Sequence, residues 1–356
     1  MPSFGRRPLG FRVLLVAALL VAALAAGHAL LWRWMSSQLQ DGFTAWAETR
    51  RAQGWRVDHA APLRGGWPLS ATLTLPQFHL AGGEATLPGG MDWQAEALLL
   101  RVSLPWVDHL VVDMPGRHRL RLGEATIPFA ADRLVAELPI ERHVPPRGAL
   151  LEGERLRFGS PAGGVEARRV RLEVQTRTTA IEGEPAVTLR GGAEGILLPE
   201  SPLQAPMLAA LGRTLQAAEF DLALNGPVPP GRGPGERAEA WRDGGGTLAL
   251  RALDLRWGPV TAAIAATLTL DEALQPMGAG TLKLAGAAQA LEAAAAAGLL
   301  TPRAAGTART VLRLLSRPPA DGGPPELNVP LTLDDRTLTL ARIPLVRLGA
   351  WEWPTR

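Results

Sequence analysis

The sequence predicts a mainly β protein with some α: an N-terminal transmembrane helix, then a curved, largely antiparallel β-sheet body covered in part by helices. Three observations predict this fold class. Residues 13–31 form an apolar run without a formal charge. The rest of the chain holds many short segments in which aliphatic and polar residues alternate, as on strands with one apolar and one polar face. One such segment, Thr-Leu-Thr-Leu, occurs at 72–75, 267–270 and 337–340.

The apolar run predicts a membrane anchor. With Trp32 it reaches about 20 residues, or about 30 Å as a helix, which matches the thickness of a bilayer core. Arg6, Arg7 and Arg12 precede it, so we expect a single pass with a cytoplasmic N-terminus and an exported body. A cleaved signal peptide is one alternative, because Ala23–Ala25 resembles a cleavage site, and a buried core helix is the other.

After the anchor the sequence predicts a helix and then strands. Leu39, Phe43 and Trp46 fall at helical spacing within 36–53. This apolar stripe fits packing on the body, and a helix lying on the membrane surface is the alternative. From Trp55 onward, Gly and Pro residues separate short alternating segments. The expected parts are 1–35, a cytoplasmic tail and transmembrane anchor; 36–225, the N-terminal helix and a β-rich portion; 226–246, a Pro/Gly-rich linker or loop; and 247–356, a C-terminal β-sheet with two helices.

The C-terminal portion has the clearest pattern. The apolar residues of 248–250 and of 253–257 alternate in opposite phases, which predicts a β-bulge between them. The Ala-rich residues 287–297 have high helix propensity. A Thr-Pro step at 301–302 then provides an N-cap and a first helical position for a second helix. We expect both helices to cover one face of the sheet.

Charge and composition exclude several functional classes. The chain has 37 basic and 34 acidic residues. Its excess of three basic residues lies ahead of the apolar run, so the body is neutral, whereas a nucleic-acid-binding protein concentrates basic charge. The absence of cysteine excludes disulfides and thiolate chemistry. No phosphate-binding glycine loop or nucleophilic-serine motif is present. We therefore expect no nucleic-acid partner, no cofactor and no enzymatic activity.

The densest polar cluster consists of Asp108, His109, Asp113 and His118. Carboxylate and imidazole side chains are ligands for zinc and related metals. However, these residues straddle a Pro-Gly turn at 115–116, and their spacing matches no recognised site. Solvated side chains near a turn are the better interpretation, so we predict neither a metal site nor catalytic residues.

Several segments resemble a known bacterial family. Two steps at strand boundaries carry the resemblance: Gly66, Trp67 and Pro68, then Trp257, Gly258 and Pro259. With the Ala-rich helix and the closing hairpin, they resemble the proteobacterial domain of unknown function 2125 across nearly the whole chain. The resemblance implies an inner-membrane envelope protein with a periplasmic body and no established catalytic residues. More distantly, the repeated strands are similar to those of AsmA-like envelope proteins, which implies a curved sheet with a lipid-holding apolar groove.

An apolar face on a curved sheet requires a cover. The two C-terminal helices can cover part of it, and lipid acyl chains would fill the rest; a sheet fully covered by helices is the alternative. The candidates for the groove lining are six leucines: Leu253, Leu255, Leu268, Leu270, Leu338 and Leu340. The predicted function is a non-enzymatic envelope protein that binds or shields lipid. A scaffold that recruits another envelope protein is the alternative, and an uncharacterised enzyme is the third hypothesis.

Overall fold

The computed structural model describes residues 9–83, 89–140, 146–160, 163–200, 205–229, 233–298, 301–316, 325–341 and 343–353. Within them the chain forms five helices and one antiparallel sheet of eighteen strands, so the predicted fold class is confirmed. The helices are α1 (Leu9–Ala52), α2 (Ala205–Leu211), α3 (Pro234–Asp243), α4 (Ala287–Ala296) and α5 (Pro302–Leu315).

The strands are β1 (Arg56–Asp58), β2 (Leu63–Gly65), β3 (Ser70–Gly82), β4 (Met91–Ser103), β5 (His109–Asp113), β6 (Arg117–Leu122), β7 (Ala125–Ala130), β8 (Arg133–Pro139), β9 (Gly148–Ser160), β10 (Gly163–Thr176), β11 (Pro185–Leu197), β12 (Thr214–Asn225), β13 (Thr247–Trp257), β14 (Val260–Leu270), β15 (Pro276–Ala285), β16 (Glu326–Asp334), β17 (Thr337–Leu340) and β18 (Ile343–Arg347).

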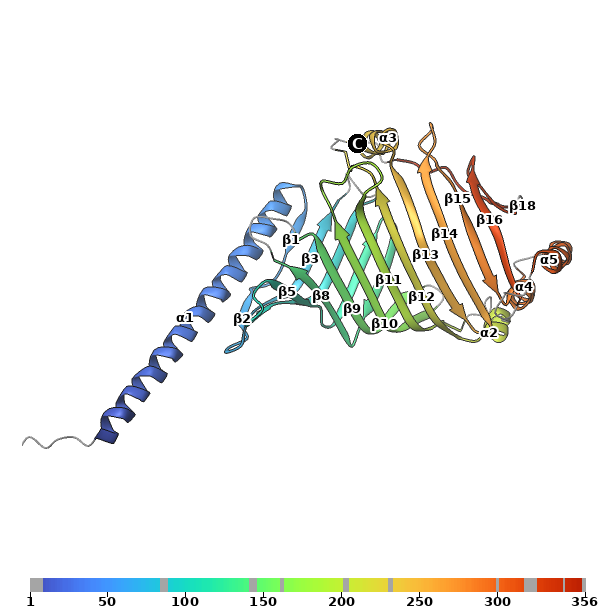
Figure 1. Ribbon diagram of the computed structural model, residues 1–356. Helices are drawn as coiled ribbons and strands as arrows, with labels where there is room; N and C mark the ends of the chain where they lie inside the picture. The colour runs from blue at the N-terminus through green and yellow to red at the C-terminus, as the bar shows by residue number, and fades with distance from the viewer. Residues whose placement is uncertain are drawn as a thin grey trace, which may run out of the picture.

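The sheet is a long meander. From β9 to β18 each strand pairs with the next one in the chain. In the N-terminal part, β5 and β6 both pair with β4, and β7 and β8 both pair with β9. The short strands β5 and β6 therefore lie end to end beside β4, and β7 and β8 lie end to end beside β9. Each strand is rotated relative to its neighbour, so the twist accumulates across the sheet. Figure 1 shows a curved sheet that extends from α1 to β18.

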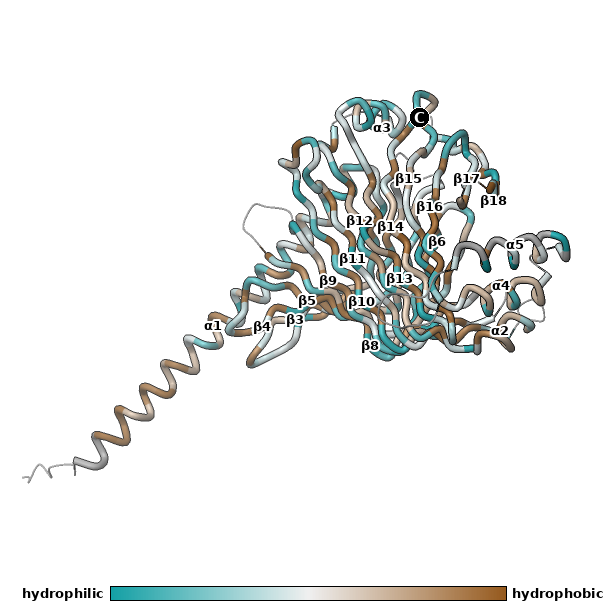
Figure 2. Tube along the Cα trace, turned by 45° about the vertical axis from the view of Figure 1, so that its right-hand side comes forward, coloured by the Kyte–Doolittle hydropathy of each residue, from teal (hydrophilic) through white to brown (hydrophobic). Residues whose placement is uncertain are grey.

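α1 is one continuous helix of 44 residues. Among the described residues it is the one helix long and apolar enough to cross a membrane. Its N-terminal part projects away from the sheet (Figures 1 and 2), and its last turns pack on the core through Leu39, Phe43 and Ala47. The stripe within 36–53 therefore packs on the body, as expected. Arg6 and Arg7 lie outside the described residues.

The other helices lie near the ends of the strands. α2 packs against α4 through Leu211 and Ala293, and Leu312 of α5 packs beside Leu327 and Val329 of β16. Figure 1 places α2, α4 and α5 together near the lower ends of the C-terminal strands, with α3 at the upper ends. None of the described helices lies above the central strands in this view.

The predicted bulge in β13 is present. Arg251 and Ala252 together oppose Ala265 alone, between the pairs Leu250–Ala266 and Leu253–Ile264. Residues 226–246 carry α3 and connect β12 to β13, which pair directly with each other. The two portions on either side of this segment therefore share one sheet.

Candidate functional site

Strand register brings the six predicted leucines to one face of the sheet. Residues directly opposite each other in antiparallel strands project to the same side. Leu268 lies opposite Leu248 on one side and Gly278 on the other. Gly278 lies opposite Leu333, which lies opposite Leu338. The same rule connects the other candidates, so all six share what we call the apolar face.

The bulge keeps both halves of β13 on this face. If the same sequence formed a regular strand without a bulge, Leu253 and Leu255 would project to the side opposite Leu248 and Leu250. With it, Leu255 lies opposite Ala262 and Leu250 opposite Ala266, and both pairs face the same way. The change of phase in the sequence thus preserves one continuous apolar surface.

The apolar face extends far beyond the six leucines. We define the apolar rung as the row of paired residues that crosses the sheet from β3 to β16: Leu73, Leu100, Val112, Ala136, Leu151, Leu172, Gly191, Phe220, Leu253, Ile264, Leu282 and Val329. Sequence reasoning missed the part contributed by β9 to β12. The signal was present in the alternation around Leu172 and Phe220, but pairing was needed to align its phase with that of β13.

One glycine in the rung has a clear steric role. A Cβ atom at Gly191 would lie 2.6 Å from Cζ of Phe220, on the neighbouring strand. Only glycine leaves room for the Phe220 ring to lie across β11, because real Cβ contacts do not come that close. The rung therefore stays apolar at β11 although it has no side chain there.

The rung is closed at its ends and open in its middle. Leu73 and Leu100 are buried in the main core, and Val329 is buried beside α4 and α5. The residues of the rung on β10 to β14 belong to no core cluster among the described residues. All six predicted leucines are only half-buried. A broad aliphatic surface is thus left partly uncovered.

One end of the open region forms a pocket of about 400 Å³ beneath α3. The sheet supplies aliphatic side chains to it, including Leu268 and Leu270. Trp241 of α3 and Trp353 of the C-terminal tail form further walls. The indole N–H of Trp241 donates to the carbonyl oxygen of Asn225 at 2.9 Å, and that of Trp353 donates to a carbonyl oxygen of the β14–β15 turn at 3.0 Å. With their polar atoms satisfied, both rings offer apolar surface to the pocket.

The opposite face of the same strands is charged. Arg171 pairs with Glu152 at 2.8 Å, and Arg190 pairs with Asp221 at 3.0 Å. These cross-strand pairs border an open hollow of about 600 Å³ over β9 to β13. Exposed pairs of this kind contribute about 0–1 kcal/mol each. They mark this face as the solvated one, which makes the sheet amphipathic.

The structure separates the four residues of the polar cluster. Asp108 and His109 form an exposed pair at 2.9 Å, and this hydrogen bond lowers the pKa of the Asp108 carboxyl. Asp113 pairs with Arg101 at 3.2 Å, while His118 is buried and donates to the carbonyl oxygen of Met114 at 3.1 Å. Within the part of the chain that the structure describes, no group of three or more acidic or histidine side chains could hold a metal ion.

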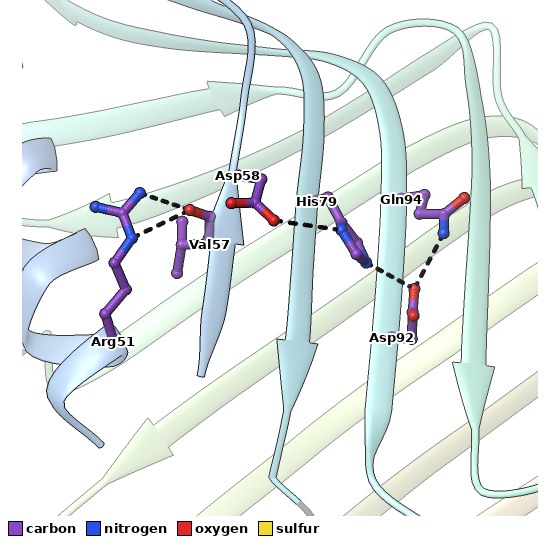
Figure 3. Close-up of polar contacts among 6 residues, drawn as sticks. All are labelled: Arg51, Val57, Asp58, His79, Asp92 and Gln94. Atoms are coloured by element: carbon purple, nitrogen blue, oxygen red, sulfur yellow. Dashed lines mark hydrogen bonds and ion pairs between the residues drawn. The ribbon is translucent and has the colours of Figure 1, made fainter. Parts of the chain in front are cut away.

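A second polar array joins α1 to the N-terminal strands (Figure 3). Arg51 donates two hydrogen bonds, at 2.5 and 3.2 Å, to the carbonyl oxygen of Val57. His79 lies between two carboxylates, with Nδ1 3.8 Å from Asp58 and Nε2 3.2 Å from Asp92. The array ties the end of α1 to β1, and β1 to β3 and β4, so we assign it to the architecture.

Both segments that carry the family resemblance are junctions. Trp257 donates from its indole N–H to the carbonyl oxygen of Gly212 at 2.8 Å. A Cβ at Gly258 would lie 2.3 Å from the carbonyl oxygen of Leu211, so only glycine lets the turn before Pro259 meet the end of α2. The second segment, 66–68, lies against α1 through the ring of Trp67.

Comparison with known proteins gives a family and no further relative. No curated protein and no solved structure matched the chain, so the similarity to AsmA-like proteins stays a prediction. Residues 32–348, which include the whole sheet and the C-terminal part of α1, match a family described as an uncharacterized protein conserved in bacteria. The chain therefore belongs to the bacterial family called domain of unknown function 2125.

Proposed function

We propose that this protein is a membrane-anchored envelope protein that binds or shields lipid acyl chains on the open middle of its apolar face. The observation that supports this most directly is the partial exposure of the rung from β10 to β14, between two buried ends. Each CH₂ group removed from water stabilises a complex by about 0.8 kcal/mol. A row of half-buried leucines therefore favours a long aliphatic ligand.

The shape of the surface also favours a chain over a compact molecule. The apolar rung crosses the strands, so the open region is a broad band, continuous with the pocket beneath α3. No charged side chain from the rung interrupts the band. We place the body on the periplasmic side of the inner membrane, where α1 holds it beside a source of lipid. The proposal assigns binding and no catalytic step.

In-cell photocrosslinking tests this proposal. The photoreactive residue p-benzoylphenylalanine would replace Leu255 or Leu268 on the apolar face. Matched controls place it at Arg256, which follows Leu255, or at Thr267, which precedes Leu268. Both control residues are exposed on the charged face. After irradiation of cells that produce the full chain, mass spectrometry should find lipid adducts at the two leucine positions and none at the controls.

A second substitution sharpens the result. Leu268→Glu places a carboxylate on the apolar face and should reduce the adducts formed at position 255 at least about tenfold, since a buried charge is costly. Thr267→Glu should leave them unchanged. Equal adducts at all four positions, or adducts at none of them, would show that the apolar face does not hold lipid in the cell.

A scaffold is the second candidate function. β18 lies at the edge of the sheet, and all five of its residues are exposed, including Ile343, Leu345 and Val346. An exposed apolar edge strand is a template for strand addition by a partner. Protein adducts from a photoreactive residue at position 345, without lipid adducts at 255 or 268, would favour recruitment of an envelope partner through this edge.

A further inference from the structure

Two loops beside α1 carry exposed apolar side chains. One is the loop 66–69 between β2 and β3, and the other is the loop 104–107 between β4 and β5. Leu69 is 69% exposed and Trp106 is 70% exposed, and Trp67 and Val107 are exposed as well. We call these four residues the loop cluster.

The two loops form one surface. The strands that lead into them are paired, with Ser70 opposite Ser103. The backbone N–H of Leu104 donates to the carbonyl oxygen of Leu69 at 2.9 Å. The loop cluster is therefore a joined tip of the sheet and not two independent loops.

Contacts with α1 fix the height of this tip along the helix. His28 Nε2 donates to the carbonyl oxygen of Pro68 at 2.8 Å, and the indole N–H of Trp32 donates to the carbonyl oxygen of Ser70 at 2.9 Å. The ring of Trp67 lies 4.9 Å from that of His28 and 5.8 Å from that of Trp32. His28 and Trp32 occupy the last turn of the apolar run. The tip thus lies beside the end of the span that would cross the bilayer.

The polar residues around the tip fit the same height. Arg33 follows Trp32 directly, and Arg64 donates to Gln40 at 2.6 Å, about two turns further from the apolar run. Trp is enriched where a membrane meets water, and Arg is suited to the headgroup layer just beyond it. The hydrogen bonds from His28 and Trp32 also satisfy polar groups that would otherwise face the lipid.

We propose that the loop cluster inserts into the bilayer interface on the side where α1 emerges. Its partner is the lipid surface itself. The protein would then contact the membrane through two elements, α1 and the loop cluster, and not through α1 alone. As a consequence, the first strands of the apolar face would lie next to the lipid surface. This inference depends on α1 as the anchor and not on acyl chains bound to the sheet.

Site-directed fluorescence tests the proposal on the full chain. The natural sequence has no cysteine, so Leu69→Cys and Trp106→Cys each create a single labelling site for the fluorophore NBD. The protein is reconstituted into vesicles of phosphatidylethanolamine and phosphatidylglycerol, with and without doxyl-labelled phosphatidylcholine as the quencher. Leu122→Cys is the matched control: it is an exposed leucine that pairs with Met91, at the far end of β4 and roughly 40 Å from Ser103.

We expect the doxyl lipid to quench NBD at positions 69 and 106 at least about twofold more than at position 122. Quenching no stronger than at position 122 would overturn the proposal. Because both substituted side chains are exposed, they should not disturb folding; near-native circular dichroism and an unchanged melting temperature check this. Iodide is a quencher dissolved in water. If the cluster inserts, iodide should quench NBD less at positions 69 and 106 than at position 122; if the cluster does not insert, iodide quenching should be equal at all three positions.

Discussion

The apolar rung is closed over β3 to β9 and open over β10 to β14, although the alternating sequence pattern is the same in both regions. In the closed region, α1 packs on the apolar face and shares one core with side chains of β5, β7 and β8, so that Leu73 is 1% exposed and Leu75 is 0% exposed. In the open region, Leu253 and Leu268 have the same chemistry and the same strand geometry but remain half-buried. Coverage, not composition, separates a core from a candidate binding surface in this fold.

The largest expected effect tests that difference in stability. Leu75→Ala should lower the free energy of unfolding by about 2–5 kcal/mol, because it leaves a cavity in a packed core. Leu268→Ala removes the same atoms from a half-covered site and should cost about 1 kcal/mol or less. Urea unfolding of the full chain in nanodiscs, followed by tryptophan fluorescence, measures both. Equal losses would mean that the open region is as well packed as the closed one.

The second prediction concerns His118, a buried histidine in the closed region. His118 is 3% exposed and its ring lies 4.7 Å from that of Phe129. Since a carbonyl oxygen can only accept, Nε2 carries the hydrogen that bonds to Met114, and Nδ1 is left buried without a partner in the described structure. Burial lowers the pKa of His118 below its ordinary value of 6.5, while the bond to Met114 and the charge of Glu96 oppose this shift.

The sign of the pH effect follows from linkage. Because the pKa of His118 is lower in the folded chain, the unfolded chain binds more protons at this residue as the pH decreases through 6.5, so stability falls until the pH passes the folded pKa. His118→Gln keeps a donor for Met114 and should remove this part of the pH dependence between pH 7 and 5. Leu75→Ala, which lowers stability without changing a titratable group, is the control and should keep the slope of the natural protein. An unchanged slope in His118→Gln would contradict the prediction.

Local pattern predicted most of the strands and the shared face. The phase change between Leu250 and Leu253 predicted the bulge, and the alternation at 253–257, 267–270 and 337–340 indicated the six leucines as candidates for one apolar surface. The sequence predicted that the apolar stripe within 36–53 packs on the body, but not that it closes the face over β3 to β9, because that depends on how α1 meets strands far away in the sequence. α3 was missed for another reason. Its helix begins at Pro234 within a Pro/Gly-rich segment, and it is held by a contact from Trp241 to Asn225 that sequence spacing does not reveal.

The smallest expected effect on stability concerns the C-terminal tail, which covers the end of the open region at the pocket beneath α3. The Gln275 side chain accepts a hydrogen bond from the backbone N–H of Trp351 at 2.7 Å and donates to its carbonyl oxygen at 3.1 Å. This exposed clamp holds the tail where Trp353 lines the pocket. Gln275→Ala should change the free energy of unfolding by less than about 1 kcal/mol, because each net hydrogen bond at an exposed site is weak.

The same substitution should have a clear local effect. Without the clamp, the Trp351 amide should exchange its hydrogen with deuterium at least about tenfold faster, while amides in the centre of β14 stay protected. Gln275→Glu is the matched control, because its side chain still accepts from the Trp351 N–H and should preserve most of the protection. If the amide of Trp351 exchanges equally fast in all three proteins, the tail does not close the pocket. The open region would then extend to the edge of the sheet, and a ligand could leave beneath α3.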